Sequence, residues 1–346
     1  MNALSTIDHE LGSFSSSLLD LTDEFFARIC EAYRRSAASL SDEDSALWRS
    51  IAGRSSHIHD AIIAGGDVRS IVSDPASNYL FFGFDNLFLD AYSDLSSSAD
   101  LQRSRHSEVA FMLHQLASAL GVGRLYNVEF GHDHPHTAGN PASAAAALAG
   151  VEEVVGPLSF PNPFPGEHGI DTGKGIVSHR AIHAVYGAWR SKALSQHFGP
   201  RVLEIGAGLG RSAYFSHLLG ITDYTIVDLP LTSLCQALFL GAALGEDMVT
   251  LSGEDRVKGR IALLPPGDLT DDYDLIVNVD SITEMGAEAA DTYAALTPKA
   301  FLSINHEANE RTAGQILGAK ADCLMRAPYW LRPGYVEELF VRSSEP

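Results

Sequence analysis

The sequence predicts an α/β protein: a doubly wound parallel sheet in the C-terminal half and a mainly helical N-terminal domain. Four short apolar runs without alternation, "RVLEI", "YTIVDL", "LIVNVD" and "AFLSIN", follow one another from residue 201 onward. Runs of this kind are typical of parallel strands buried on both faces. Helical patterns separate them, which indicates βαβ units. A chain of 346 residues is long enough for roughly two domains.

Charge and composition exclude several classes of function. The chain has 24 basic and 44 acidic residues, a formal charge of -20, which would repel a phosphate backbone, so we expect no nucleic-acid partner. No apolar run approaches the roughly 18 residues of a membrane helix, and "MNALSTIDHELGSF" is not a secretion signal, so we expect no membrane association and a cytoplasmic location. Cys30, Cys235 and Cys323 form no CxxC pair, which disfavours a disulfide framework or a thiolate zinc site.

Residues 1–125 read as the helical N-terminal domain. Apolar residues recur at helical spacing in "LLDLTDEFFARICEAYRR" and "SEVAFMLHQLASALG", with few runs rich in β-branched residues. "SDEDSALWRSIAG" opens with serines and acidic residues before an apolar periodic run, as the start of a helix does.

Residues 126–175 read as a connecting and flap segment. "LYNVEFGHDHPHTAGNP" and "GPLSFPNPFPGEHGIDTGKG" are dense in Pro, Gly and His, and loops of that length are usually functional or disordered. We expect Glu167, His168 and Lys174 to lie on a mobile flap that closes over ligand; the alternative is a solvated loop. Pro135 interrupts the alternating histidines of "GHDHPHTAG" and no distant ligands can be assigned, so we predict no metal site there.

Residues 176–346 begin with a helix and then a glycine turn between two predicted strands. In "RVLEIGAGLGRSAYFSHLLGITDYTIVDLP" the turn contains Gly206, Gly208 and Gly210, and Asp228 ends the second strand. A dinucleotide fingerprint would place a small residue where Arg211 stands, and no G-K-[ST] follows for a phosphate loop. The turn therefore predicts a ligand other than a pyrophosphate.

Two carboxylates indicate which ligand the turn holds. Glu204, just before the first glycine, would repel a pyrophosphate but attract a cation. Asp228 ends the next strand, where an acidic side chain can accept hydrogen bonds from both ribose hydroxyls. A ribose ligand with a positive charge and no phosphate fits. The alternative is that the glycines only make a tight turn and Asp228 caps the following segment.

At this point the stretch resembles the first two motifs of the class I S-adenosylmethionine (SAM)-dependent methyltransferases. The resemblance implies a Rossmann-like methyltransferase domain over residues 176–346, with SAM as cofactor and S-adenosylhomocysteine (SAH) as product. It also implies that Glu204 lies near the methionine moiety and that Asp228 holds the ribose. The other cofactor contacts that we expect are Gly206, Ala207, Gly208, Gly210, Leu229, Asp280 and Ser281.

Further segments resemble the sugar O-methyltransferase family of bacterial polysaccharide and natural-product clusters. They are "YLFFGFDNL" at 79–87, "PNPFPGEHGIDTGKGIVSHRAIHAVYGAW", "NVDSITEM", "SINHE" and "APYWLRPGYVEELF". The resemblance implies methyl transfer to a hydroxyl of a sugar or glycosylated small metabolite. The alternatives are N- or C-methylation of a non-sugar metabolite and a SAM-binding partner subunit without catalysis. We expect the helical domain to supply the acceptor pocket and an interface for a homodimer.

Methyl transfer to a hydroxyl requires alignment of the reactants and a base. "NVDSITEM" and "SINHE" follow two strands of the sheet, so Asp280 and His306 should reach the same edge. His306 is the expected general base, oriented by Glu307, because imidazole titrates near neutral pH. Asp280 is expected to be a base or a metal ligand, with a helix cap as the alternative. A divalent cation on Asp280 and Glu284 is a less favoured alternative.

The helix before the first strand offers further candidates. His179 and His183 are four residues apart and share a face with Tyr186. We expect His183 to be a third catalytic candidate, and packed histidines are the alternative. The expected acceptor contacts are His179, Tyr186, Glu284, Glu167 and His168.

Overall fold

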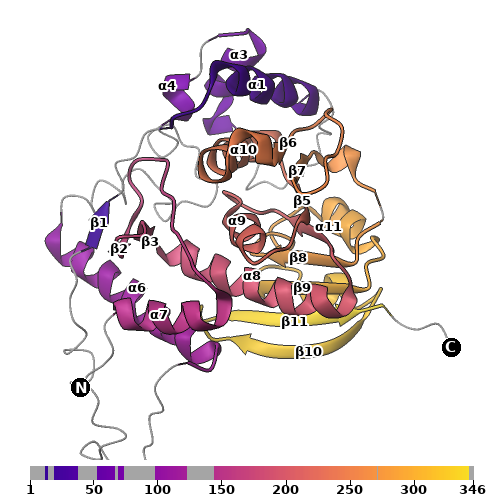
Figure 1. Cartoon of the computed structure of the whole chain (residues 1–346). Helices are drawn as coiled ribbons and strands as arrows, with labels where there is room; N and C mark the ends of the chain where they lie inside the picture. Colours follow the sequence, from indigo (N-terminus) through magenta and orange to yellow (C-terminus); the bar gives the residue numbers. More distant parts are fainter. Residues whose placement is uncertain are drawn as a thin grey trace, which may run out of the picture.

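The computed structural model describes residues 12–14, 19–37, 53–66, 69–73, 98–122, 144–270 and 272–342. Figure 1 shows their arrangement around one large sheet. The segments "YLFFGFDNL" and "GHDHPHTAG" lie outside the described residues, so the expectations placed on them stay predictions.

The central sheet has eight strands in the order β10-β11-β9-β8-β4-β5-β7-β6. All neighbours from β9 to β6 run parallel, whereas β11 is antiparallel to both β9 and β10. This confirms the predicted α/β class with a mainly parallel sheet. The strands are β4 (Arg201–Ile205), β5 (Asp223–Val227), β6 (Val249–Thr250), β7 (Ile261–Leu264), β8 (Leu275–Val279), β9 (Ala300–His306), β10 (Asp322–Tyr329) and β11 (Tyr335–Val341).

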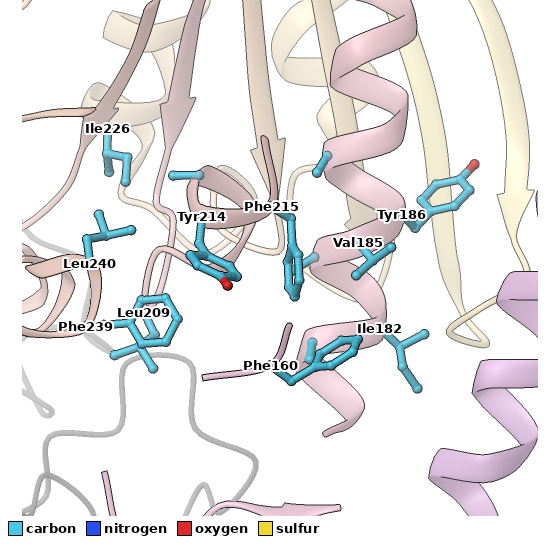
Figure 2. Close-up of a cluster of buried hydrophobic side chains, with 14 of the residues drawn as sticks. Phe160, Ile182, Val185, Tyr186, Leu209, Tyr214, Phe215, Ile226, Phe239 and Leu240 are labelled. Carbon is cyan, nitrogen blue, oxygen red and sulfur yellow. The ribbon is translucent and has the colours of Figure 1, made fainter. Parts of the chain in front are cut away.

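Helices cover both faces of the sheet, which explains why its strands are apolar without alternation. Val202 and Ile226 pack in the same core cluster as residues of α8, α9 and α10, while Leu203 and Val227 pack with α11 and α12. Figure 2 shows the first cluster, in which Phe215 of α9 lies between Tyr214 and Val185 of α8. The helices are α8 (His179–Phe198), α9 (Arg211–Leu218), α10 (Pro230–Leu244), α11 (Ala287–Ala294) and α12 (Ala313–Leu317), with 3-10 helices η2 (Glu246–Met248) and η3 (Pro266–Asp268).

The order of the strands reverses between β4 and β8. From β4 the chain continues to β5 and β7 on one side of the sheet, and it then returns to β8 and β9 on the other. In open α/β sheets, ligands bind outside the carboxyl ends of the strands at such a switch point. The glycine turn, Asp228, Asp280 and His306 follow or end these strands, so all of them lie at this edge.

The described helices of residues 1–125 pack at two separate places. Helix α1 lies against α10, where a side chain at Gly241 would overlap the Phe25 ring, and α6 lies against α7 and α8. Figure 1 shows α1 and α6 far apart. A separate helical domain is therefore not seen in the described part of the chain. The described helices of residues 1–125 are α1 (Asp23–Ala37), α3 (Ser56–Ile63), α4 (Arg69–Val72) and α6 (Ala99–Ala119), whereas α7 (Ala144–Val155) lies in the connecting segment.

The predicted flap belongs to a small second sheet in the order β1-β2-β3. Its strands are β1 (Gly12–Phe14), β2 (His168–Asp171) and β3 (Ile176–Val177). Lys174 lies in the β2–β3 turn and forms an ion pair with Glu152 at 2.6 Å. Within the described ranges, no helix combines the length and apolar character needed to cross a membrane.

Candidate active site

The glycine turn between β4 and α9 needs glycine at each of its three positions. Gly206, Gly208 and Gly210 have φ angles of 69°, 56° and 87°, in the left-handed region that other residues enter only at a cost. The Gly206 N–H donates to the Val227 carbonyl at 3.0 Å, which ties the turn to the end of β5. A Cβ at Gly206 would also overlap the Ser281 hydroxyl.

We expect Gly206→Ala to destabilise the protein more than Gly259→Ala does. Gly259 has a φ of 90° but nothing within 4 Å of an added Cβ, so its variant carries only the backbone cost of about 1–2 kcal/mol. Gly206→Ala adds an overlap with Ser281, which we expect to cost about 1–3 kcal/mol more. Urea unfolding of the two variants measures the difference, and equal midpoints would contradict a tight contact between the turn and Ser281.

Asp228 holds the glycine turn through its carboxylate. Its Oδ1 accepts from the Leu229 N–H at 2.9 Å and its Oδ2 from Gln236 Nε2 at 2.7 Å, and the Ala207 N–H donates to it as well. The bond to Leu229 is part of the capping role that we considered as the alternative. Burial raises the pKa of Asp228 to about 7, although these donors lower it.

Gln236 is a residue of this site that sequence reasoning missed. Its Nε2 donates both to the Gly208 carbonyl at 3.0 Å and to Asp228, so it bridges the turn and the carboxylate. The side chain is fully buried, and its Oε1 has no hydrogen-bonding partner in the described structure. The signal in the sequence was a single long polar side chain within the apolar helix "PLTSLCQALFLGAAL".

Glu204 lies beneath the glycine turn and is 2% exposed. Its carboxylate accepts from the Tyr224 hydroxyl at 2.9 Å and from Ser212. Burial, with a smaller contribution from the charge of Asp228, raises the pKa of Glu204 to about 7. Two carboxylates in a poorly solvated site disfavour each other's charge. A cationic ligand beside the turn would relieve that repulsion.

Ser281 packs against the turn from the end of β8. Its hydroxyl donates to the Ile205 carbonyl at 3.0 Å, and Asn278 Nδ2 donates to the same carbonyl at 2.9 Å. The Ser281 N–H donates to Asn305 Oδ1 at 3.1 Å. These buried bonds join the ends of β4, β8 and β9, so the predicted cofactor residue Ser281 supports the turn from below.

Asp280 has a φ of 57°, the only positive value at a non-glycine residue in the described part of the chain. Such strain persists only where neighbouring groups hold the residue. Arg332 Nη1 donates to Asp280 Oδ2 at 2.7 Å and the Tyr335 hydroxyl to Oδ1 at 2.6 Å. Both oxygens thus have partners from the β10–β11 turn, and the alternative of a helix cap by this carboxylate is not seen.

His306 faces two carboxylates across short gaps. Its Nε2 lies 3.9 Å from Asp280 Oδ1 and 3.8 Å from Glu284 Oε1, which is beyond hydrogen-bond distance but close enough for one oxygen beside the pair to contact both. The Ala308 N–H donates to His306 Nδ1 at 3.3 Å. That bond assigns the proton of the neutral ring to Nε2.

Glu307 does not orient His306, contrary to the sequence prediction. Its carboxylate accepts from Arg326 on β10. The residue that faces His306 is Glu284, whose side chain is 24% exposed. Burial and then the charge of Asp280 raise the pKa of Glu284 to about 7, although Arg332 and Arg180 oppose the shift.

The ligand atoms of Asp280, Glu284 and His306 lie within 4.8 Å of one another, close enough for a cation. Their contacts fit one poorly. Arg332 already neutralises Asp280, and the His306 atom that faces the carboxylates carries the proton, whereas a metal needs an unprotonated nitrogen. We therefore assign no metal to these three side chains.

The candidates on α8 contact the β10–β11 hairpin. The Tyr186 hydroxyl donates to Glu337 Oε2 at 2.5 Å, and Arg190 donates to Oε1 at 2.6 Å. His183 Nδ1 shares a hydrogen bond with the Tyr329 hydroxyl at 2.7 Å, and its ring lies 4.8 Å from that of His179. Figure 2 shows the Tyr186 hydroxyl directed away from the apolar cluster. Tyr186 and His183 are therefore helix–hairpin contacts in this structure, and their roles as acceptor contact and base stay predictions.

Glu167 and His168 are buried, 2% and 3% exposed. Glu167 forms a buried ion pair with Arg211, the residue that departs from the dinucleotide pattern. The ion pair ties the β2–β3 hairpin to the first turn of α9. This corrects the prediction that these side chains lie on a mobile flap that closes over ligand.

No family model matches the sequence, and no curated protein matches it. Among solved structures, the chain is similar to magnesium protoporphyrin IX methyltransferase from Synechocystis with bound SAM, at 15% identity and a TM-score of 0.36, over 47% of this chain and 81% of that one. It is also similar to a SAM-dependent methyltransferase from Neisseria gonorrhoeae, at 15% identity and a TM-score of 0.31, over 46% of this chain and 73% of that one. At these values the function has to be argued from the chain's own residues.

Proposed function

We propose that the protein is a SAM-dependent methyltransferase. The observation that carries the proposal is the single hydrogen-bonded unit at the switch point, in which Asp228 binds the glycine turn directly and through Gln236. The unit offers a carboxylate for ribose hydroxyls, backbone N–H and carbonyl groups for the methionine part, and Leu229 beside the base. Arg211, the cation next to the turn, is bound to Glu167, so this unit suits a ligand without phosphates.

SAM would supply a methyl group activated by a positively charged sulfur. Burial raises the pKa values of Glu204 and Asp228, and a cation bound beside them would favour their charged forms. The residues of this chain would then bind and orient the cofactor at the ends of β4 and β5 and receive the acceptor at the ends of β8 and β9.

We further propose that the acceptor is a hydroxyl of a sugar or glycosylated small metabolite. Support comes from the motif resemblance and from the polar groups beyond β8 and β9, where Glu284, His306, Arg332 and Tyr335 can bind a hydroxylated molecule. Methylation of a hydroxyl also needs a base, and this cluster contains one. The net charge of -20 supports a small acceptor over nucleic acid. A homodimer and a cytoplasmic location remain part of the proposal.

Calorimetric titration with SAH, with NAD as the control ligand, tests the cofactor. We expect SAH to bind and NAD not to bind; binding of NAD alone, or of neither, contradicts the proposal. The acceptor is then sought by mass spectrometry with SAM and a panel of methyl glycosides and nucleoside-diphosphate-linked hexoses and 6-deoxyhexoses. Gain of one methyl on oxygen supports the sugar acceptor, whereas an N-methyl or C-methyl product from control amines or phenols refutes it.

The affinity for SAH should increase between pH 6 and pH 8. The pKa of Asp228 is about 7, and the carboxylate form accepts hydrogen bonds from two ribose hydroxyls while the acid form accepts them poorly. The stability of the ligand-free protein should change in the opposite direction. Burial raises the folded-state pKa of Asp228 above the unfolded value of about 3.9. The free energy of unfolding that protonated Asp228 contributes is therefore lost as pH rises from about 4 through 7. Calorimetry and thermal unfolding over this range measure both.

A further inference from the structure

We propose that Glu284 is the general base that accepts the proton of the acceptor hydroxyl, and that His306 donates a hydrogen bond beside it. The inference rests on the proposed methyl transfer. It differs from the sequence prediction, in which His306 was the base and Glu284 an acceptor contact. Three titratable side chains at the ends of β8 and β9 compete for the role, and their contacts decide among them.

Asp280 is unsuited to be the base because its oxygens are both engaged. Arg332 and Tyr335 donate to them at 2.7 and 2.6 Å, and the Arg332 guanidinium also lies 4.0 Å from the centre of the Tyr335 ring. A carboxylate whose two oxygens are bound to a guanidinium and a phenol presents no unoccupied oxygen to an acceptor hydroxyl. Asp280 instead holds Arg332 and Tyr335 in place at the rim of the site.

His306 presents a proton rather than a lone pair to the site. Its Nδ1 accepts from the Ala308 N–H, so Nε2 carries the proton of the neutral ring. Nε2 is the atom that faces Glu284 and Asp280 at 3.8 and 3.9 Å. A neutral imidazole in this tautomer can donate to an acceptor oxygen that lies beside His306 and Glu284, but it cannot remove a proton through Nε2.

Glu284 meets the requirements for the general base that Asp280 and His306 do not meet. Its carboxylate accepts no hydrogen bond from the residues that the structure describes, and its side chain is 24% exposed. Asp280 from β8 and His306 from β9 face it, and the charges of Arg332 from the β10–β11 turn and Arg180 from α8 act on it. With a pKa of about 7, a large fraction is carboxylate at neutral pH, and its conjugate acid is weak enough for efficient proton transfer.

The step balances with the groups already named. Glu284 Oε1 takes the proton of the acceptor hydroxyl while the acceptor oxygen forms a bond to the methyl carbon, and the electron pair of the broken carbon–sulfur bond stays on sulfur. The products are a methyl ether, SAH and neutral Glu284, which then releases its proton to water. His306 Nε2–H orients the acceptor oxygen throughout.

Steady-state kinetics of Glu284→Gln and His306→Gln distinguish between the two candidate bases. The substrates are SAM and the acceptor that the panel identifies. We expect Glu284→Gln to lower kcat by roughly 10²–10⁴, to leave the Kd for SAH within twofold, and to abolish the limb of the kcat/KM profile near pH 7. Glutamine at 306 retains an N–H donor, so His306→Gln should lower kcat less than tenfold and keep the limb. A Glu284→Gln rate within twofold of the parent, or loss of the limb only in His306→Gln, overturns the assignment.

A second measurement needs no acceptor. In the SAH complex, ¹³C NMR of carboxyl-labelled glutamate should show a resonance that titrates near pH 7 and is missing in Glu284→Gln; a midpoint near 4 overturns the assignment. A different result would contradict the proposed function as a whole. If the parent protein does not bind SAH, methyl transfer itself is refuted, whereas a parent that methylates an acceptor while Glu284→Gln does so equally well refutes only the base.

Discussion

We expect Asp228→Asn to lower the affinity for SAH by roughly 10²–10⁴. This variant is the most decisive test of the cofactor site. The substitution keeps the shape of the side chain but removes its charge. A hydrogen bond to a charged group contributes about 1.5–3 kcal/mol, and two ribose hydroxyls would donate to this carboxylate. Their loss corresponds to about 3–5 kcal/mol, or two to four orders of magnitude in Kd. Isothermal titration calorimetry at pH 8, where the carboxylate is charged, measures the effect.

Asp223→Asn is the matched control for this variant. Asp223 lies at the opposite end of the same strand, where it pairs with Arg201 and Arg256 at the surface. Its substitution should leave the Kd for SAH within twofold. If Asp228→Asn also binds within about threefold of the parent, while both variants unfold cooperatively, the ribose assignment is wrong and Asp228 only caps α10.

Glu337→Leu should destabilise the fold by about 3 kcal/mol without weakening SAH binding. Glu337 is 5% exposed and accepts hydrogen bonds from Tyr186 and Arg190. Breaking a buried ion pair typically costs about 3–5 kcal/mol because the remaining charge is left desolvated. Arg190 is 20% exposed, so we expect the lower value. In a chain of 346 residues that corresponds to a fall in Tm of about 4 °C, measured by thermal unfolding.

Two variants test whether the broken ion pair between Glu337 and Arg190 causes the loss of stability. Glu337→Leu combined with Arg190→Met removes both charges and should recover most of the lost Tm. Tyr186→Phe should cost only about 1–2 kcal/mol and leave the KM for the acceptor unchanged. A Tyr186→Phe protein with normal Tm but a raised acceptor KM would return Tyr186 to the acceptor site, as the sequence predicted.

The fold and the cofactor edge could be predicted because they depend on local features. A strand buried on both faces needs an unbroken apolar run, and a turn with three left-handed residues needs glycine at those positions. Asp228 follows from both, since the end of a parallel strand next to the turn lies at the edge where ligands bind. The sequence showed that Arg211 departs from the dinucleotide pattern. It did not show that Glu167 is the ion-pair partner of Arg211.

The roles of the acid–base residues could not be predicted in the same way. The placement of β11 between β9 and β10 brings Arg332 and Tyr335 onto Asp280, and it brings Glu337 onto Tyr186 and Arg190. These contacts join residues far apart in the chain, and each changes which atom is free to donate or accept a proton. The same applies to Gln236, whose importance becomes visible only when α10 packs beside the turn.

The sequence by itself determined the α/β class, the four strands β4, β5, β8 and β9, and the position of the glycine turn with its acid. These depend on backbone conformation and on apolar pattern, which are encoded within a few residues. Only the tertiary structure decided that His306 presents its Nε2 proton, that both oxygens of Asp280 are engaged, and that Glu284 lies opposite with no donor among the described residues. Protonation states depend on burial and on charges within a few ångströms, and packing between distant segments sets both.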